Sequence, residues 1–470
     1  MRRPWWRGPG PLAVIVGLSL LAYAGHAALR FLTYHAPAYD LGFFDQLVTN
    51  LSGGRGWRTS FLTYDFRGQH WEPILLVWAQ LDRLLATPAW LLLVNSVALA
   101  LAPVAAWRLA RSWLGPSSAA APLAALATAL SPIVLRTAGF DYHSEALTPL
   151  LALLALDAAA RRRWLLMAAC CAVLVLLKED AFLVVAGVGW MIWRVERRRA
   201  GLLLSGAALL GFVAVVGVFM PWVRQGRTTD LLARYAYLAP GGHAATTPLG
   251  IATGMVSHPG VWIAHLTGPA AAQGLAMALV PLALLPLLSG WALVAAVPVL
   301  ALALLSNDPY QSSLHLQYGA EAFPLLLACA MLGWRRLASW GPLRRAQVGR
   351  AAPVAAVAFV LAAVPVYANL PGQASDLWGL DRRAAVATVL GRVPGTVAVA
   401  ASTDLVAQLS ERGQVTEFPD VRGACWVVID SRGGVSVEAL RAGYGAALQR
   451  LPEAFHLVAA QGGVELWERS

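Results

Sequence analysis

The chain carries long, uninterrupted apolar runs, and these limit its fold more than any other feature. The runs recur along most of the sequence at roughly 20 residues each, the length that crosses a bilayer as a helix. Hydrophobic residues make up 58% of the 470 residues and charged residues only 13%, against about 25% in soluble domains. A helix satisfies its own backbone hydrogen bonds in lipid, so the sequence predicts an all-α polytopic membrane domain.

The apolar pattern predicts about eleven transmembrane helices. They lie at residues 11–29, 89–107, 118–135, 145–160, 164–177, 181–193, 201–222, 270–287, 289–305, 320–334 and 351–369. The first run follows the basic stretch "MRRPWWRGPG". No small-residue cleavage site precedes a soluble domain there, so we interpret this run as an uncleaved span rather than a signal peptide.

Arginine placement predicts the orientation in the membrane. The arginines gather in alternate, short connections: near the N-terminus and at 108–111, 161–163, 194–199 and 335–350. By the positive-inside rule these connections and the N-terminus face the cytoplasm, which predicts a multi-pass protein of the cytoplasmic (inner) membrane. The same bias accounts for the net charge of +11 without a nucleic-acid partner.

The composition changes after residue 369, which predicts two domains. Residues 1–369 form the transmembrane domain, and residues 370–470 form a small α/β domain on the extracytoplasmic side. "GTVAVAAS" and "ACWVVID" are typical of buried strands, and "STDLVAQLSE" and "VSVEALRAGYGAALQRL" of helices. "FHLVAAQGGVELWER" predicts a hairpin that turns at Gly-Gly.

Several common chemistries are excluded by residue usage. Lys178 is the single lysine of the chain, so a P-loop with its Gly-Lys pair is absent. No Asp-x-Asp pair and no GxSxG or HExxH motif occurs, and the four cysteines lack zinc spacing. Chemistry must therefore use polar residues at the outer ends of the helices.

Four polar clusters lie in the connections predicted to face outside. They are Asp40 and Asp45 in "YHAPAYDLGFFDQ", His70 and Glu72 in "RGQHWEP", Asp141, His143 and Glu145 in "FDYHSE", and Lys178, Glu179 and Asp180 in "LLKEDAF". Ionisable residues at membrane depth cost a few kcal/mol each and usually mark function.

Each cluster also has a plain structural interpretation. Asp40 and Asp45 are either water-facing acids of a juxtamembrane turn or a general base with a positioning partner. Lys178 either pairs with Glu179 or Asp180 to cap a turn or offers a fixed cation to an anion such as a lipid phosphate. Asp141, His143 and Glu145 either bind substrate hydroxyls, hold a divalent metal (Asp141 and His143) or are solvated. The loops at 224–243 and 306–318 either close over a site or are ordinary solvated loops, and we favour the second interpretation.

The ordered motifs "YDLGFFDQ", "HWEPILLVWAQLDRLLATP", "DYHSEAL" and "LLKEDAF" resemble a family of bacterial multi-spanning membrane proteins classed as a domain of unknown function. "VAVAASTDLVAQLSERGQVTEFP" and "WVVID" resemble its C-terminal region. That family in turn resembles the GT-C glycosyltransferases, which use a polyprenyl-phosphate sugar and place an acid in the first outer loop.

The GT-C resemblance implies a reaction and roles for the clusters. It implies an inverting glycosyltransferase that moves a sugar from a polyprenyl-phosphate donor in the membrane to a hydroxyl of a glycan, lipid or protein acceptor. The base would be Asp40 or Asp45, and Lys178 and Arg136 would bind the donor phosphate. His70, Glu72, Asp141, His143, Glu145, Glu179 and Asp180 would bind substrate, and an amphipathic helix would cover about 72–86. No cofactor is required, and a divalent metal is the alternative.

Two other functions fit the composition. A transporter or flippase of a lipid-linked or anionic substrate would place its acids near mid-span in two similar halves. A non-catalytic envelope scaffold would use the tail domain to bind a partner and would tolerate loss of both aspartates.

Overall fold

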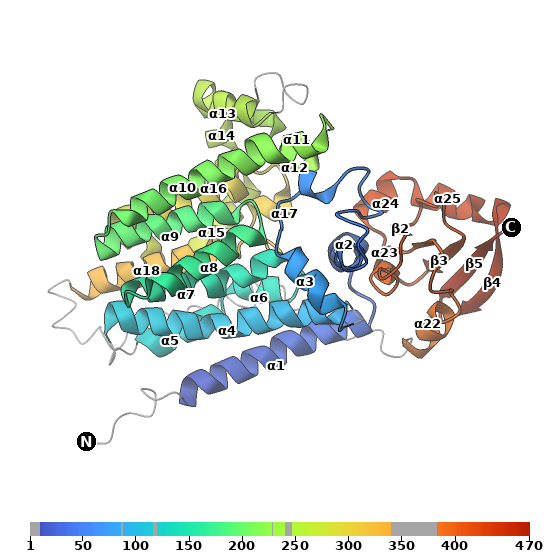
Figure 1. Ribbon diagram of the computed structural model, residues 1–470, viewed down its shortest axis with the longest axis horizontal. Coiled ribbons are helices and arrows are strands. Elements are labelled where there is room, and N and C mark those ends of the chain that lie inside the picture. The colour runs from blue at the N-terminus through green and yellow to red at the C-terminus, as the bar shows by residue number, and fades with distance from the viewer. Residues whose placement is uncertain (1–9, 86–87, 116–119, 228, 240–246, 340–382) are drawn as a thin grey trace.

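The computed structural model describes residues 10–85, 88–115, 120–227, 229–239, 247–339 and 383–470. The predicted span at 351–369 and the predicted domain boundary at residue 369 lie outside these residues. Figure 1 shows an elongated helical part and a smaller part, built around a sheet, at one end of it.

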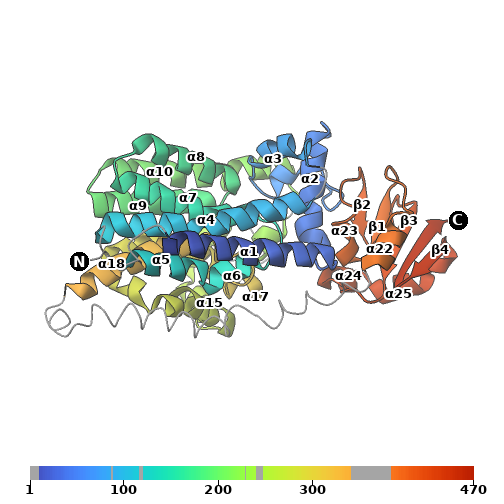
Figure 2. The same cartoon turned by 90° about the horizontal axis from the view of Figure 1, so that it is seen from below.

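The helical part is a bundle whose longer members run along its long axis (Figures 1 and 2). These are α1 (Gly10–Leu32), α4 (Ala89–Leu114), α5 (Ala120–Ala129), α7 (Thr148–Ala160), α8 (Trp164–Leu177), α9 (Ala181–Glu196), α10 (Ala200–Ala214) and α18 (Phe323–Ala338). Shorter helical segments extend or join them: α6 (Pro132–Ala138), η4 (Ser144–Leu147), η5 (Val215–Phe219), α11 (Met220–Arg224), α12 (Asp230–Ala233), η6 (Ala236–Leu238), α13 (Pro248–Ser257), α14 (Pro259–Leu266), α15 (Pro269–Leu279), η8 (Val280–Leu282), η9 (Leu285–Ala296), α16 (Val297–Leu304) and α17 (Pro309–Ser312).

Within the described residues, four helical stretches are long and apolar enough to cross a bilayer: Gly10–Leu32, Ala89–Leu114, Ala200–Arg224 and Leu285–Leu304. Two bent pairs bring the number to six if each is one span, with bends of 43° (α5 with α6) and 65° (α14 with α15 and η8). Helices α7, α8, α9 and α18 fall on predicted blocks but have fewer than 18 residues each, so they are not among these stretches. The count of eleven and the predicted sidedness stay predictions.

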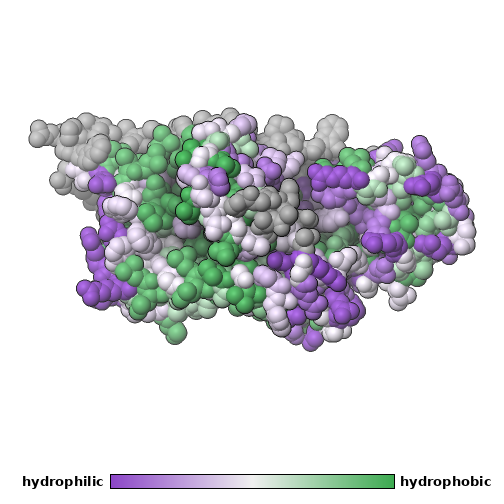
Figure 3. Space-filling view, turned by 90° about the horizontal axis from the view of Figure 1, so that it is seen from above, coloured by the Kyte–Doolittle hydropathy of each residue, from purple (hydrophilic) through white to green (hydrophobic). Residues whose placement is uncertain are grey.

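The outer surface of the bundle is apolar, as a lipid-facing surface must be. Leu165, Leu203 and Leu210 are 87%, 77% and 72% exposed. In Figure 3 apolar side chains form a broad band over the helical part, and hydrophilic side chains gather at its far end and over the sheet part. The pattern is that of a helical membrane domain with polar ends.

The arginine-rich connections meet at the end of the bundle away from the sheet. Asp157 of α7 accepts from Arg108 Nε of α4 (2.9 Å) and from Arg161 Nε (2.7 Å). Glu196 at the end of α9 accepts from Trp113 Nε1 (3.1 Å). These contacts bring together three of the connections that the sequence places on one side.

At the other end, the connection between α1 and α4 folds into short helices. They are the π-helical turn η2 (Ala38–Gly42), α2 (Phe43–Ser52), η3 (Phe66–Gly68) and α3 (Leu75–Asp82). Rings of Phe43, Phe44, Phe66 and Tyr142 pack with centroids 5.3 to 6.2 Å apart. α3 lies within the stretch 72–86, where an amphipathic helix was expected, but it is shorter and exposes the apolar side chains of Leu76 and Val77.

The C-terminal part is a five-stranded sheet with helices. Its order is β2-β1-β3-β5-β4, with β1 (Val399–Ala401) parallel to β2 (Val415–Glu417) and β3 (Trp426–Asp430). β4 (Phe455–Gln461) and β5 (Val464–Arg469) form an antiparallel hairpin. The helical segments are α22 (Arg383–Leu390), α23 (Thr403–Val406), α24 (Val437–Arg441), α25 (Tyr444–Arg450) and η12 (Leu451–Glu453).

The strands and the Gly-Gly hairpin of the tail are confirmed, and its helices differ from the prediction. The expected helix over "VSVEALRAGYGAALQRL" is broken into α24 and α25 at Gly443, whose φ is +83°. Such a backbone favours glycine and ends the first helix. Strand β2 was not expected, because its three residues give too short a pattern.

The sheet part docks on the outer connections through polar contacts. Ser410 Oγ donates to Asp45 Oδ2 (2.7 Å), and Gln408 Nε2 donates to the carbonyl of Phe31 (2.9 Å). The amide of Ala38 donates to Thr403 Oγ1 (3.4 Å). In Figure 1 α23 lies beside α2 accordingly.

Candidate active site

A cavity of about 750 Å³ opens where the connection between α1 and α4 meets the sheet part. Its wall includes side chains from η2, the segment before α3, the connection between α8 and α9, and the segment that leads into α18. Eight of the predicted residues line it: Asp40, His70, Glu72, His143, Glu145, Lys178, Glu179 and Asp180. Four motifs that are far apart in sequence therefore share one cavity.

Asp40 is the acid of the first cluster that reaches the cavity. Its side chain is 22% exposed, and Oδ1 lies 3.3 Å from Nε2 of the buried His143. The imidazole stacks on Phe140 (ring centroids 5.5 Å apart) and meets the edge of Phe44 (5.4 Å). Burial tends to lower the pKa of His143, but the contact with Asp40 raises it on balance. His143 therefore orients an acid that remains open to the cavity.

Lys178 is held by a buried carboxylate. It ends α8 in an extended conformation, and Nζ pairs with Glu145 Oε1; the two side chains are only 10% and 4% exposed. The partner of Lys178 is thus Glu145 rather than Glu179 or Asp180, so a local turn cap is not what forms. An ammonium has three N–H donors, which leaves others for a ligand.

Hydrogen bonds join the cluster of His70 and Glu72 to the cluster of Lys178, Glu179 and Asp180. His70 Nδ1 lies 2.9 Å from Glu179 Oε1, and the amide of Trp71 donates to Glu179 Oε2 (2.9 Å). Glu72 Oε2 accepts from Ser144 Oγ (2.6 Å). Because both carboxylates have protein partners, they act as a fixed scaffold for the cavity wall.

Asp180 is a different kind of carboxyl. Burial, with the neighbouring charge of Glu179, raises its pKa to about 7, against the lowering effect of Lys178 and Arg234. A carboxyl in this range can exchange a proton near neutral pH.

Sequence reasoning missed part of the wall. Glu321 is 7% exposed and lines the cavity, and its Oε1 has no hydrogen-bond partner among the described residues. An acid at the start of an apolar block, "AEAFPLLL", could have indicated it.

Described residues of the loops at 224–243 and 306–318 also line the cavity, so these segments are not simply solvated. Arg234 lines the cavity and contacts Gln311 Oε1 (2.8 Å), Tyr318 Oη (3.3 Å) and Asp308 Oδ2 (3.3 Å). Arg224 lines it too and donates to the carbonyl of Gly68 (3.0 Å).

Asp45 does not reach the cavity. The π-helical turn ends at Gly42 and α2 begins, so Asp45 points to the sheet part, where it is fully buried against Ser410. Burial raises the pKa of this carboxyl well above its usual value, although the Ser410 hydrogen bond lowers it. The structure thus separates two aspartates that the sequence could not distinguish.

Asp141 and Arg136 also lie outside the cavity wall. Asp141 is buried and pairs with Arg30 Nη2 (2.9 Å); burial raises its pKa to about 6 despite that arginine. Arg136 is 7% exposed, and its Nε and Nη1 have no partner among the described residues. It lies near the 313–319 segment, since Thr137 Oγ1 is 3.5 Å from the carbonyl of Leu316.

The cavity wall has an acidic set and an apolar set of side chains. The cationic side chains of the wall are Lys178, Arg224 and Arg234, and the acids are Asp40, Glu72, Glu145, Glu179, Asp180, Glu321 and Glu438. The apolar set includes Phe212, Val216, Ile251, Met255 and Leu302. Such a cavity suits an amphipathic ligand with one polar, hydroxyl-rich end.

The metal alternative stays a prediction. Asp141 contacts Arg30 and His143 contacts Asp40, so each predicted ligand has another partner. In the described ranges no group of three or more His, Cys, Asp or Glu is arranged to hold a metal ion.

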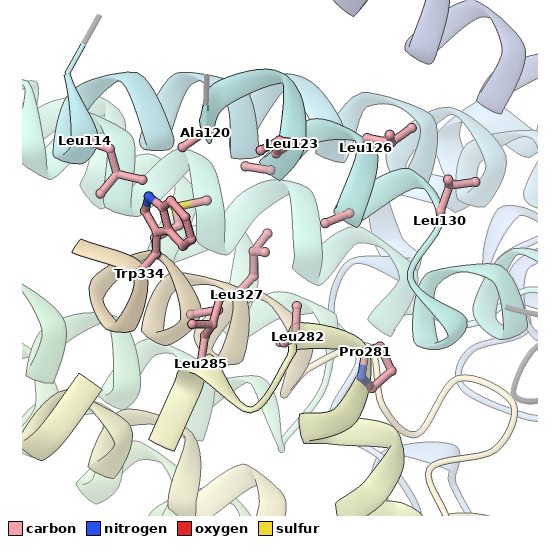
Figure 4. Close-up of a pocket in the computed structure, with 14 residues that line it drawn as sticks. Leu114, Ala120, Leu123, Leu126, Leu130, Pro281, Leu282, Leu285, Leu327 and Trp334 are labelled. Atoms are coloured by element: carbon pink, nitrogen blue, oxygen red, sulfur yellow. The ribbon is translucent and has the colours of Figure 1, made fainter. Parts of the chain in front are cut away.

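A second, smaller cleft is apolar. It measures about 90 Å³ and lies between α5 on one side and η8 and α18 on the other. Figure 4 shows Leu123, Leu126 and Leu130 facing Leu282, Leu327 and Trp334 across it. None of the predicted residues lines it.

A family model described as "Predicted membrane protein (DUF2079)" matches residues 31–428. The chain belongs to the DUF2079 family. The motifs that line the cavity all fall within this match. A search of curated proteins found no match to the chain.

Solved structures show the fold of this DUF2079 protein. ArnT from Cupriavidus metallidurans bound to undecaprenyl phosphate is 13% identical, with a TM-score of 0.52 and 98% of both chains covered. ArnT from the same organism in the apo state is also 13% identical, with a TM-score of 0.52 and 97% of both chains covered. Arabinofuranosyltransferase AftD from Mycobacteria is 16% identical, with a TM-score of 0.46 over 98% of this chain and 40% of that one. The likeness to ArnT shows that this chain shares the fold of that protein.

Proposed function

We propose that this protein is a membrane glycosyltransferase that moves a sugar from a polyprenyl-phosphate donor to an acceptor hydroxyl, with Asp40 as general base. The observation that carries the proposal is the shared cavity of Asp40 and Lys178. An acid that can take a proton and a cation that can meet a phosphate line one space, which also has an apolar set of side chains in its wall. The likeness to ArnT bound to undecaprenyl phosphate supports the donor class.

The reaction needs few groups. The acceptor hydroxyl loses its proton to the Asp40 carboxylate, and its oxygen forms the bond to the anomeric carbon from the face opposite the phosphate. The bond between that carbon and the phosphate oxygen breaks, and polyprenyl phosphate leaves with the electron pair. A phosphate is a stable leaving group, so no general acid is required, unlike in glycoside hydrolysis. The outcome is inversion at the anomeric carbon.

Lys178 stabilises the negative charge that develops on the leaving phosphate. Arg234 is placed to assist, since its charge and that of Lys178 both act on Asp180. Arg136, which lies outside the cavity wall, has no part in this step. His143 keeps the Asp40 carboxylate oriented toward the acceptor.

The remaining wall residues hold the sugar. Carboxyl oxygens accept hydrogen bonds, and Glu72, Glu179 and Glu321 offer several acceptors to sugar hydroxyls. The prenyl chain lies along the apolar side chains of Phe212, Ile251 and Leu302. The protein would act at the outer face of the inner membrane, with its N-terminus in the cytoplasm.

A lipid comparison tests this function. Cells that lack the protein should accumulate one polyprenyl-phosphate sugar, and re-expression of the wild type should clear it. An unchanged profile of such lipids would contradict transfer and favour the envelope scaffold. Accumulation confined to the inner leaflet would instead favour a flippase.

A further inference from the structure

The sheet part presents a second polar surface beside the cavity, at the carboxyl ends of its parallel strands. β1 leads through α23 to β2 on one side, whereas the chain after β3 continues toward β4 and β5 on the other. The two neighbouring strands β1 and β3 therefore define a switch point in the sheet. In open α/β sheets, ligands bind in the crevice outside the carboxyl ends of the strands at such a point.

Polar groups are closely packed at the carboxyl ends of β1 and β3. The amide of Asp430 donates to Ser402 Oγ (2.9 Å), and the amide of Gly434 donates to Asp404 Oδ2 (2.6 Å). A Cβ on Gly433 would lie 3.0 Å from a carboxylate oxygen of both Asp404 and Asp430. At Gly433 the loop after β3 thus lies closer to the two acids than a residue with a Cβ could. Backbone N–H groups donate to these carboxylates, for example that of Gly434 to Asp404.

Glu417, the last residue of β2, provides an independent indication of a ligand. Its side chain is 6% exposed, and its Oε1 has no hydrogen-bond partner among the described residues. A buried carboxyl atom without a partner is costly. Burial raises the pKa of Glu417 against the effect of hydrogen bonds from Ser436 and Thr403. A ligand hydroxyl at Oε1 would satisfy this atom.

This surface is continuous with the cavity. Thr403 Oγ1 accepts from the amide of Ala38 (3.4 Å), two residues before Asp40. Glu438 of α24 lines the cavity itself, and its charge acts on Glu417. On the opposite rim Tyr39 is 44% exposed and packs edge-on against Phe61 (5.4 Å). A path of acceptor groups and an exposed ring therefore runs from Glu417 to Asp40.

We propose that the carboxyl-end edge of the sheet, with Glu417 and Glu438, is an acceptor subsite that binds a neutral, hydroxyl-rich saccharide and delivers one hydroxyl to Asp40. The assignment rests on the proposed glycosyl transfer for its role, but the binding of a saccharide can be measured without it. Separate, fixed carboxylates suit the several hydroxyls of a sugar ring, and a partly exposed tyrosine offers it an apolar face.

Hydrogen exchange of the full-length protein in lipid nanodiscs tests the subsite. The probes are the disaccharides maltose, cellobiose and chitobiose at millimolar concentration, with an arginine-rich peptide as a cationic alternative. At least one disaccharide should slow exchange at 415–418 and 430–438 in the wild type. The protection should weaken about fivefold or more in Glu417→Gln or Glu438→Gln, because each loses a charge-assisted hydrogen bond.

Matched controls keep the test sharp. Glu438 is exposed, so Glu438→Gln cannot fail simply by misfolding, and the exposed Glu453 lies at the opposite edge of the sheet, next to β4. Glu453→Gln should behave as the wild type. Protection by the peptide alone, protection by no disaccharide, or equal protection in all variants would overturn the subsite.

A second arm separates this proposal from the function beneath it. If the wild type transfers sugar from polyprenyl phosphate and both Gln variants keep the acceptor KM, the subsite is wrong and the transfer stands. If disaccharides protect the edge but no polyprenyl-phosphate sugar is consumed, the saccharide site stands and the transfer is wrong. A rise of about fivefold in acceptor KM with unchanged donor KM supports both.

Discussion

The pair of Lys178 and Glu145 gives a prediction whose size follows from the structure. Both side chains are almost fully buried, at 10% and 4% exposed. At a separation of about 3 Å and an effective dielectric constant near 20, the attraction is about 5 kcal/mol. Desolvation opposes it by several kcal/mol per ion. Because removal of one partner leaves a buried, unpaired charge, Lys178→Met and Glu145→Gln should each destabilise the protein by about 3–5 kcal/mol.

The double variant separates the pair from its surroundings. With neither charge present, the cost of a buried unpaired ion disappears. The sum of the two single destabilisations should therefore exceed the destabilisation of the double variant by at least ~1.5 kcal/mol. Unfolding in mixed micelles of dodecyl maltoside and SDS, followed by tryptophan emission, measures all four proteins. The surface pair of Arg422 and Asp420 is the control and should show a coupling of at most about 1 kcal/mol.

Additive single effects, within about 0.5 kcal/mol, would refute this reasoning. They would mean that the Lys178 ammonium is not held by Glu145. The cation would then not be preorganised beside Asp40, and the proposed phosphate contact would lose its basis.

Three further predictions follow. Burial raises the pKa of Asp45, so the contribution of this carboxyl to stability falls as the pH rises above its pKa in the unfolded chain, near 4. Asp45→Asn should therefore raise the melting temperature at pH 7 and not at pH 4. An equal gain at both pH values would contradict this. His143→Asn should lower kcat about 10- to 100-fold with unchanged donor KM; a change in KM alone would argue against orientation of Asp40. A Cβ on Gly189 would lie 2.6 Å from the carbonyl of Gly201, so Gly189→Val should lower the melting temperature, and an unchanged melting temperature would contradict close packing of α9 on α10.

The sequence predicted the membrane class and the clusters because both depend on local patterns. Apolar runs mark helices, and the acids and histidines of four motifs mark their outer ends. The hairpin at Gly462 and Gly463 was also predictable, since a Gly-Gly turn between alternating residues has few other outcomes. These features need no knowledge of distant contacts.

The roles within the clusters could not be predicted, because they depend on contacts between distant segments. Asp40 and Asp45 differ only in that one meets His143 and the other meets Ser410, which is 365 residues away in sequence. Lys178 has two acids beside it in sequence but pairs with Glu145, 33 residues earlier. The sequence around Arg234 is typical of a loop. Its place in the cavity wall depends on contacts with segments that are distant in sequence.

Sugar transfer by two matched aspartate variants tests the central claim most directly. Purified full-length protein is given polyprenyl-phosphate sugars with acceptor from the cell envelope, and transfer by Asp40→Asn is compared with that by Asp45→Asn. Loss of a general base costs about 10²- to 10⁴-fold, so Asp40→Asn should lose at least a hundredfold in kcat, while Asp45→Asn should stay within a few fold of the wild type. Equal activity of Asp40→Asn and the wild type, or a loss confined to Asp45→Asn, would contradict the assignment of the base.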